Sequence, residues 1–439
     1  MRALAGLALL VLAVACAQGA PLAGDPQPPP ASPAVSVRAA ALPTAQPSAS
    51  PEPPPPVDLD ARASELARRF IILDGHIDVP HRLWSSRDKA GQLTEDVTAR
   101  TEKGDFDFPR ARAGGLDAPF MSIYVPAKLE AGGAKKLADQ LIDLVEGIAK
   151  KAPDDCRIAR SVGEVRENAK QGKLSLLLGM ENGSPIEKKL ENVTHFHGRG
   201  VRYITLAHSK DNHLSDSSYD DRHTHKGLSP FGEKVVAEMN RLGIMVDVSH
   251  LSDDAFWDVM ATSKAPVVAT HSSCRHFTPG WSRNMSDEMI SALAKKGGVI
   301  QINFGSGFID EKIQKAESQR WKDRAALLKK HKLESSDPKA KPLLAKFEKD
   351  SPPKFATVAQ VADHIDHVKK LVGVDHVGLG SDFDGVGDSL PTGLKDVSQY
   401  PGLIKVLLER GYTEAEIEKI CSGNVLRVWE AAEAFAGKR

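Results

Sequence analysis

Eight short apolar segments, most of them separated by segments with the pattern of amphipathic helices, constrain the fold of this chain more than any other feature. One separating segment, residues 229–243, has the expected boundaries of a helix, with Ser229 as the N-cap, Pro230 at the first helical position and Gly243 beyond the end. Strands that alternate with helices form parallel βαβ units, and eight such units predict a (β/α)8 TIM barrel. The expected strands are residues 70–76, 118–125, 174–181, 201–208, 244–250, 266–271, 298–304 and 376–382.

A doubly wound open sheet is the main alternative to the barrel. It is disfavoured because no glycine-rich dinucleotide fingerprint follows the first apolar segment. Two segments interrupt the regular alternation of strands and helices. Residues 81–117 are expected to form a long loop after the first strand, and residues 309–355 form a charged, helix-prone insertion after the seventh. For the insertion, solvated helices are favoured over a functional role.

The N-terminal residues lack this alternation. Residues 1–16, MRALAGLALLVLAVAC, have an early arginine, a short apolar run and small residues before Cys16, which is typical of an export signal. The ending AVAC resembles the lipobox of bacterial lipoproteins, in which the cysteine is lipidated; an ordinary cleaved signal with a chance cysteine is the alternative. Residues 17–57 are rich in Ala, Pro and Ser and are expected to be a disordered tether. Residues 58–439 are expected to form the folded domain, exported and lipid-anchored at the bacterial cell envelope.

Charge and cysteine content exclude some classes of protein. Lys plus Arg and Asp plus Glu both number 58, so the formal net charge is zero and nothing indicates a nucleic-acid partner. Cys156, Cys274 and Cys421 remain after Cys16, and an odd number of cysteines implies no disulfide framework. Fifteen histidines, in contrast, are a supply of metal ligands and of acid–base groups.

His76 and Asp78 lie two positions apart in ILDGHIDVP, an otherwise apolar stretch. Residues i and i+2 of a strand point to the same face, so both side chains are expected to point together at the C-terminal end of the first strand. Chemistry in this class of barrel is built at that end. Each such residue alone is more often a satisfied polar group than a ligand, but six strand ends with the same pattern indicate a metal or acid–base site. The other five strand ends carry Glu181, His208, His250, His271 and Asp382.

The residue types at this rim indicate the chemistry. Three imidazoles with two carboxylates suit zinc or another borderline divalent metal. Because one zinc ion needs three protein ligands and a water, five or more candidates fit two ions that share a bridging carboxylate better than one. Two metals about 3.5 Å apart can hold a hydroxide between them and polarise a carbonyl. The rim therefore predicts hydrolysis of an amide, an ester or a phosphoester.

Long motifs in the sequence resemble the membrane dipeptidase (renal dipeptidase) family. They run in order from about residue 70 to 432: DGHIDVP, LLLGMENG, YITLAHSKDN, GLSPFGEKVVAEMNRLGIMVDVSHLS, APVVATHSS, RNMSDEMI, VGLGSDFDG and GNVLRVWE. The resemblance implies a TIM barrel of the metal-dependent hydrolase (amidohydrolase-like) type with two zinc ions per subunit. It also implies hydrolysis of dipeptides by a metal-bridging hydroxide. The family accepts a D-residue at the C-terminal position and opens the β-lactam ring of carbapenems.

The resemblance also implies roles for individual residues. His76 and Asp78 resemble the ligands of one zinc, His250 and His271 those of the other, and Glu181 the carboxylate that bridges them. The pair His-x-Asp is diagnostic, because related amidohydrolases usually carry His-x-His on the first strand.

Three more residues resemble groups that handle the substrate. His208 resembles the residue that contacts the substrate carbonyl and stabilises the oxyanion. Arg283 resembles the residue that pairs with the terminal carboxylate, a task that suits its planar fork of donors. Asp382 resembles the residue that binds the free amino group and moves the proton, with Asp384 as the alternative.

Other functions and partners stay open at the level of the sequence. A deaminase or phosphotriesterase with the same barrel is one alternative, and a catalytically silent binding protein tethered at the envelope is another. The intact set of five ligand positions argues against a silent site. Members of the family are often dimers, so a homodimer is an expectation, although no interface can be identified from the sequence.

Overall fold

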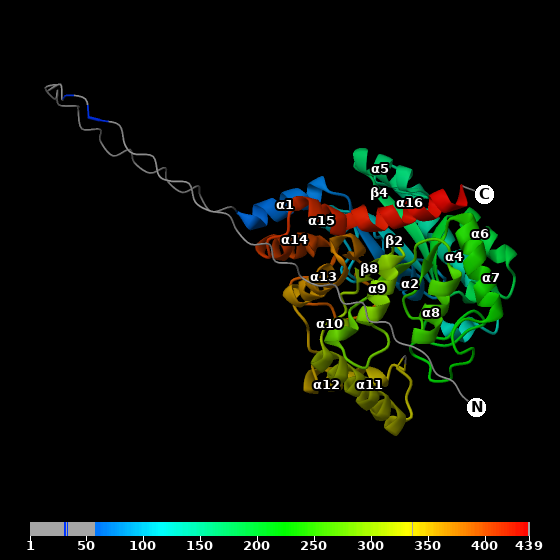
Figure 1. The fold of residues 1–439 in the computed structure, drawn as a ribbon. Helices are drawn as coiled ribbons and strands as arrows, with labels where there is room; N and C mark the ends of the chain where they lie inside the picture. Colours follow the sequence, from blue (N-terminus) through cyan, green and yellow to red (C-terminus); the bar gives the residue numbers. More distant parts are fainter. Residues whose placement is uncertain (1–29, 32, 34–57, 336, 438–439) are drawn as a thin grey trace, which may run out of the picture. The chain divides into compact units, whose positions relative to one another are not determined.

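Eight parallel strands close into a barrel in the computed structural model, which describes residues 30, 31, 33, 58–335 and 337–437 (Figure 1). The strand order is β2-β1-β9-β8-β7-β6-β5-β4, and pairing of β2 with β4 closes the ring. A short ninth strand, β3, pairs with β4 outside the ring. The strands are β1 (Ile72–Ile77), β2 (Leu116–Tyr124), β3 (Cys156–Ile158), β4 (Leu174–Glu181), β5 (Val201–Thr205), β6 (Met245–Asp247), β7 (Val268–Ser272), β8 (Val299–Ile302) and β9 (Val377–Leu379).

The predicted barrel is confirmed, because each of the eight apolar segments overlaps one strand of the ring. Several strands end earlier than predicted. β5 ends at Thr205 rather than His208, and β6 ends at Asp247 rather than His250. The polar residues that follow leave the hydrogen-bonded ladder and lie in the loops above the rim. The sequence did not predict β3, whose three residues are too few to form an apolar pattern.

Helices cover the outside of the barrel, and α7 has the boundaries that the sequence predicted. The Ser229 side chain accepts a hydrogen bond from the backbone of Gly232 at its start, and Gly243 adopts a left-handed conformation at its end. Within the described residues, no helix is both long enough and apolar enough to cross a membrane. The helices are α1 (Leu59–Arg69), α2 (Val79–Ser85), α3 (Phe108–Gly114), α4 (Ala134–Lys151), α5 (Val162–Lys170), α6 (Glu191–Arg199), α7 (Pro230–Leu242), α8 (Asp253–Thr262), α9 (Asp287–Lys295), α10 (Ser306–Ile309), α11 (Glu311–His331), α12 (Ala340–Asp350), α13 (Val358–Val372), α14 (Tyr400–Glu409), α15 (Glu414–Glu418) and α16 (Asn424–Ala436).

The two interruptions of the alternating pattern both contain helices. Residues 81–117, expected to be a long loop, include most of α2 and all of α3. The charged insertion forms α11 and α12, which lie together at the lower edge of the ribbon in Figure 1. The barrel, its helices and the insertion, within residues 58–335 and 337–437, belong to one compact unit.

One end of the barrel is closed by apolar packing. Side chains from the strands, among them Leu73, Phe120 and Tyr203, form a buried cluster with Trp429 of α16. The rings of Phe120 and Trp429 lie 5.7 Å apart, and Trp429 is fully buried. This cluster leaves the opposite end of the barrel, at the C-terminal ends of the strands, for polar side chains.

His364 of α13 joins that helix to the loops that follow β7 and β8. Its Nδ1 accepts the backbone N–H of Cys274 at 3.0 Å, and its Nε2–H donates to the carbonyl of Ile309 at 3.0 Å. The ring is fully buried, and burial lowers the pKa of His364 to about 4. A second proton on Nδ1 would point at the N–H of Cys274, so the folded protein keeps this imidazole neutral.

We expect His364 to make the protein less stable in acid. In the unfolded chain His364 takes up a proton near pH 6.5, but in the folded chain only near pH 4. The contribution of neutral His364 to the free energy of unfolding is therefore complete above pH 6.5 and is lost as the pH falls to 4. The loss is about 3 kcal/mol in the free energy of unfolding. When urea unfolding is measured at pH 7, 6 and 5, the free energy of unfolding should fall more steeply with decreasing pH for the wild type than for His364→Gln. Equal slopes would exclude His364 as the cause.

Candidate metal centre

His76 and Asp78 lie where the end of β1 meets the loop after β9. The Asp74 carboxylate accepts the N–H of Ser381 at 3.0 Å, and the N–H of Asp382 donates to the carbonyl of His76 at 3.0 Å. Asp78 lies beyond β1, at the N-cap position of α2, so strand alternation does not place it as the sequence suggested. Its carboxylate still reaches the imidazole, since His76 Nε2 lies 3.3 Å from Asp78 Oδ2.

Glu181, the last residue of β4, lies at the centre of four imidazoles. Its Oε2 is 3.3 Å from His76 Nε2. Its Oε1 is 3.1 Å from His250 Nε2, 3.4 Å from His271 Nε2 and 3.5 Å from His208 Nε2. The structure therefore brings together on one carboxylate the side chains that the sequence placed at the ends of four other strands.

Tyr203 fixes the orientation of His76 from inside the barrel. Its hydroxyl is 2.8 Å from His76 Nδ1, so Nε2 is left to face the carboxylates. The Tyr203 ring fits against Gly179 of the neighbouring strand, where an added Cβ would lie 2.0 Å from the ring. Hydrogen bonding of the remote ring nitrogen is the usual way in which proteins orient a histidine ligand.

A buried carboxylate, Asp247, orients His271 in a similar way. Asp247 Oδ2 accepts hydrogen bonds from the hydroxyls of Thr205 at 2.5 Å and Thr270 at 2.7 Å. Thr270 Oγ1 lies 2.8 Å from His271 Nδ1, which directs His271 Nε2 towards Glu181. His250, on the next loop, adopts a left-handed backbone conformation with φ of 68°, a strained geometry that is concentrated at functional sites.

The electrostatics of the cluster suit a metal ion. Burial works to raise the pKa of Glu181, but the neighbouring histidines outweigh burial and hold that pKa well below its usual range. Burial lowers the pKa of His250 and of His271 well below their ordinary value. At Glu181, His250 and His271 the result is an ionised carboxylate beside neutral imidazoles, the protonation state that metal ligands require. At His76, burial is outweighed by the charges of Tyr203, Glu181 and Asp78, which raise the pKa of that imidazole well above its ordinary value.

The donor atoms also have the spacing of metal ligands. At this rim, three groups of side chains each have their donor atoms within 4.8 Å of one another, and two of the three share Glu181. Ligands of a tetrahedral zinc at ~2.1 Å lie about 3.4 Å apart, close to the separations around Glu181. His76 Nε2 is buried without a hydrogen-bond partner in the structure, although two carboxylates face it. The residues therefore fit a divalent metal. The first group is His76, Glu181 and His271, the second is Glu181, His208 and His250, and the third is His76, Asp78 and Asp382.

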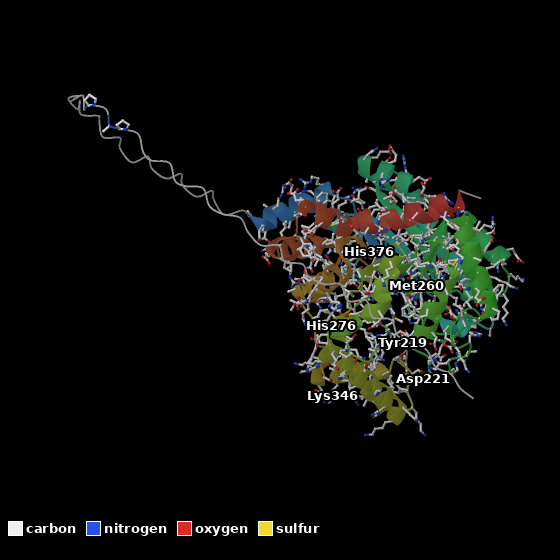
Figure 2. The ribbon with its side chains drawn as sticks, in the orientation of Figure 1. Tyr219, Asp221, Met260, His276, Lys346 and His376 are labelled. Carbon is white, nitrogen blue, oxygen red and sulfur yellow. The ribbon has the colours of Figure 1, made fainter. Side chains whose placement is uncertain are left out.

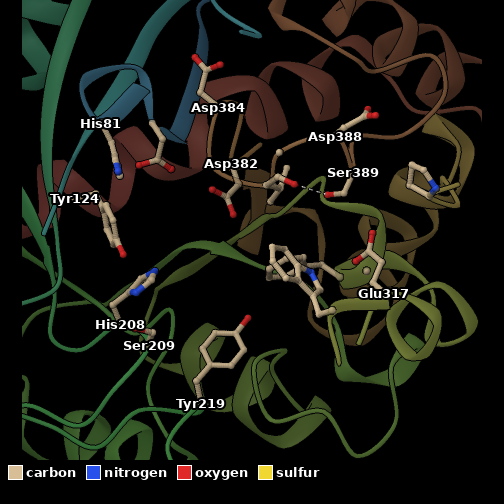
Figure 3. Close-up of a pocket in the computed structure, with 18 of the residues that line it drawn as sticks. His81, Tyr124, His208, Ser209, Tyr219, Glu317, Asp382, Asp384, Asp388 and Ser389 are labelled. Atoms are coloured by element: carbon tan, nitrogen blue, oxygen red, sulfur yellow. Dashed lines mark hydrogen bonds between the residues drawn. The ribbon is translucent and has the colours of Figure 1, made fainter. Parts of the chain in front are cut away.

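Asp382 and Asp384 have different environments, although the sequence could not separate them. Asp382 Oδ2 accepts a hydrogen bond from Asn303 Nδ2 at 2.7 Å and belongs to the metal-ligand groups. Asp384 instead accepts the N–H of Asp105 at 2.7 Å and lies 3.4 Å from Arg82 Nε. Both residues have a positive φ, so strand alternation does not apply, and Asp384 lies apart from Asp382 in Figure 3.

Arg283 is buried between β7 and the cleft. Its Nη1 donates to Ser272 Oγ at 2.9 Å and its Nη2 to the carbonyl of His271 at 3.0 Å, while Nε has no hydrogen-bond partner in the structure. The guanidinium lies close enough to Tyr219 to oppose the rise that burial causes in the pKa of that phenol. A buried arginine without a carboxylate partner beside a cleft is suited to an anionic group of a ligand.

A cleft of about 1550 Å³ opens over the cluster (Figure 3). His208, whose ring lies 4.8 Å from that of Tyr124, faces the same space as Asp382 in Figure 3. The insertion reaches this cleft through α11, a contact that the sequence did not predict. The barrel side of the lining includes Asp78, Tyr124, Glu181, His208, His250 and Asp382, and the α11 side includes Gln314, Glu317, Ser318, Arg320, Trp321 and Arg324.

Sequence reasoning missed several residues that position the centre. Asn303, the partner of Asp382, follows the apolar β8 and is the polar end of a strand for which no rim residue was predicted. Tyr203 and Asp74 lie inside strands, where polar atoms are normally satisfied by structure alone. For Asn303, the sequence offered one indication: in QINF it lies two positions after Gln301, at the end of an apolar segment.

The barrel and this rim define a metal-dependent hydrolase of the TIM-barrel class. The family model for membrane dipeptidase (peptidase family M19) matches residues 60–439. The chain belongs to that family, whose members are metallo-dipeptidases, and the resemblance noted in the sequence is confirmed.

Known proteins agree with this membership. The chain is 31% identical to mouse Dipeptidase 3 over 385 residues, which is 87% of the chain and 68% of the mouse protein. It is similar to the crystal structure of the probable dipeptidase PvdM from Pseudomonas aeruginosa, with a TM-score of 0.72 and 27% identity over 86% of the chain and 99% of that structure. A metallopeptidase from Rhodobacter sphaeroides, liganded with a phosphinate mimic of the dipeptide L-Ala-D-Ala, matches with a TM-score of 0.65 and 26% identity over 83% and 99% of the two chains.

Proposed function

We propose that the chain hydrolyses dipeptides with two zinc ions bridged by Glu181. His76 and Asp78 would hold one ion with Glu181 Oε2, and His250 and His271 would hold the other with Oε1. The observation that carries the proposal is the division of the two Glu181 oxygens, since Oε2 faces His76 and Oε1 faces His250 and His271. When bound, two such ions polarise a carbonyl and supply a nucleophilic hydroxide at neutral pH.

The chain's own side chains would bind the dipeptide and move the proton. Asp382 would hold the free amino group, accept a proton at its carboxylate and pass it to the departing amine. Burial, with the nearby carboxylates of Asp78 and Glu181, raises the pKa of Asp382 to about 7, near the value that suits a general base at neutral pH. His208, whose side chain is one-fifth exposed, would donate a hydrogen bond to the carbonyl oxygen as negative charge develops.

A panel of substrates tests the proposed activity. Zinc-loaded protein should cleave L-L dipeptides and, as the ligand of the Rhodobacter relative suggests, L-D dipeptides such as L-Ala-D-Ala. Nucleosides and aryl phosphates in the same panel represent the deaminase and phosphotriesterase alternatives. Turnover of either one without turnover of dipeptides would overturn the proposal, and protein with two zinc ions that is inert on every compound would favour a binding role.

Arg283 is expected to set the affinity for the terminal carboxylate. Arg283→Lys keeps the charge but removes the planar fork of donors, so KM for a dipeptide should rise about 10- to 100-fold, the equivalent of a charged hydrogen bond of roughly 1.5–3 kcal/mol. The value of kcat should change less. Steady-state kinetics on L-Ala-L-Ala and on its C-terminal amide would check this result. If both proteins discriminate between acid and amide equally, Arg283 does not bind the carboxylate.

We propose further that residues 1–16 are an export signal, that residues 17–57 are a tether and that Cys16 carries a lipid anchor. These segments lie almost entirely outside the described residues, as does Cys16, so support comes from the sequence pattern and from membership of a membrane dipeptidase family. In a bacterial host, the wild type should be found in the membrane fraction and Cys16→Ala in the soluble envelope fraction. Identical fractionation of the two active proteins would contradict lipidation.

A further inference from the structure

A second group of metal-binding side chains lies on the outside of the barrel. His276 belongs to a short turn, Arg275–Phe277, in the segment between β7 and α9; Asp287 is the first residue of α9; and His367 belongs to α13. Each offers one donor atom, and the donor atoms all lie within 4.8 Å of one another. His276 is exposed and is labelled in Figure 2. None of the three side chains belongs to the groups around Glu181.

The two imidazoles are already arranged around the carboxylate. His367 Nε2 lies 2.8 Å from Asp287 Oδ1, and the rings of His276 and His367 stack with their centres 4.3 Å apart. Phe277 packs beside both rings, at 4.9 Å from that of His276 and 5.7 Å from that of His367. Stacking and the Phe277 ring therefore hold the two imidazoles beside each other, with His367 next to Asp287 and His276 exposed.

The charge around Asp287 leaves it available to a cation. Within the described part of the chain, no lysine or arginine nitrogen lies within 4 Å of its carboxylate, and His367 is its one ion-pair partner. A carboxylate in the first turn of α9 is also favoured by the helix dipole, but the dipole does not account for two imidazoles from other segments. The Asp287 side chain is 39% exposed and that of His367 15%, so water can reach the remaining coordination positions.

The donor set defines the class of ion. Two imidazole nitrogens and one carboxylate oxygen suit zinc and its neighbours in the transition series, rather than magnesium or calcium. The donor atoms lie within 4.8 Å of one another, compared with about 3.4 Å between the ligand atoms of a tetrahedral zinc, so the side chains would move closer together on binding. Water would complete the tetrahedron.

We propose that His276, Asp287 and His367 bind one borderline divalent cation of the zinc class, at a site separate from the centre around Glu181. Bound there, the cation fastens the segment between β7 and α9 to α13. That segment carries Arg283, and it already contacts α13 through the hydrogen bond from Cys274 to His364. The site thus provides a link between the concentration of free metal and the rigidity of the segment behind the cleft.

The number of bound metal ions tests this proposal. Full-length protein is first loaded with zinc and washed, and calorimetry then follows the binding of further Zn²⁺ at pH 7.5. The wild type should bind one more equivalent than the double variant His276→Ala/His367→Ala, whatever the occupancy of the centre around Glu181. Asp287→Asn should weaken binding of the extra ion by about tenfold or more. His331→Ala, which removes an exposed histidine of α11, is the matched control and should bind as the wild type does.

A second measurement separates loss of the site from loss of the fold. Every variant should hydrolyse dipeptides at the wild-type rate in metal-buffered solution, because none of the three residues is part of the cleft lining. With the centre around Glu181 already loaded, further zinc should raise the thermal midpoint of the wild type and of His331→Ala but not that of the double variant. Equal stoichiometry in the wild type and the active double variant would overturn the proposal.

Discussion

Glu181→Gln is expected to abolish turnover together with metal binding. The amide keeps the size of the side chain and its place beside Ser122, whose hydroxyl lies 3.3 Å from Glu181 Oε2, so the fold should survive. It removes the negative charge that lies within 3.5 Å of four imidazoles. Loss of a partner that only orients a ligand already costs 10–100-fold in metal affinity, so loss of a shared ligand should cost more than about 100-fold.

Metal content and kcat should be measured on the same preparations of Glu181→Gln. Zinc per chain should fall by close to two, and activity should return only in part at high zinc concentration. Glu191→Gln, which makes the same chemical change at an exposed position of α6, should keep wild-type zinc and activity. A Glu181→Gln protein with full zinc content and full turnover would refute the role of Glu181 as the bridge.

Asp382→Asn is expected to lower kcat by about 10²–10⁴-fold, the usual contribution of a general acid–base group. An amide can still meet Asn303 through its oxygen, and asparagine tolerates the left-handed conformation of this residue, whose φ is 63°. Alanine would instead be strained there. Because the change removes the proton acceptor and spares Glu181, most of the bound zinc should remain, which distinguishes this variant from Glu181→Gln.

Asp384→Asn is the matched control for Asp382→Asn. Its carboxylate contacts Arg82 and the backbone of Asp105, so its loss should lower the thermal midpoint while kcat stays within about tenfold of the wild type. Thermal unfolding and steady-state kinetics of both variants separate the two roles. If Asp384→Asn lost more turnover than Asp382→Asn, the assignment of the proton acceptor would have to be exchanged.

The sequence predicted the features that leave a regular local pattern of residue types along the chain. Alternation of apolar segments and helices repeats along the chain, so it predicted the barrel, and polar residues after apolar segments predicted the cluster around Glu181. Contacts between distant segments leave no such repeat. The link from Tyr203 to His76, the support of Asp382 by Asn303 and the different environments of Asp382 and Asp384 all arise from tertiary packing. The left-handed backbone at Asp382 and Asp384 also made the rule of strand alternation inapplicable there.

The helix α11 brings mostly exposed side chains to the cleft, in contrast to the buried side chains of the centre around Glu181. It contributes to the wall of the cleft, yet of its 21 residues only Ile313 and Leu328 are buried, and Trp321 is 67% exposed. Substitutions at exposed positions usually change stability by less than 0.5 kcal/mol. The side chains of α11 that line the cleft can therefore change at little cost to the fold, whereas changes to the buried residues around Glu181 would disturb the centre itself.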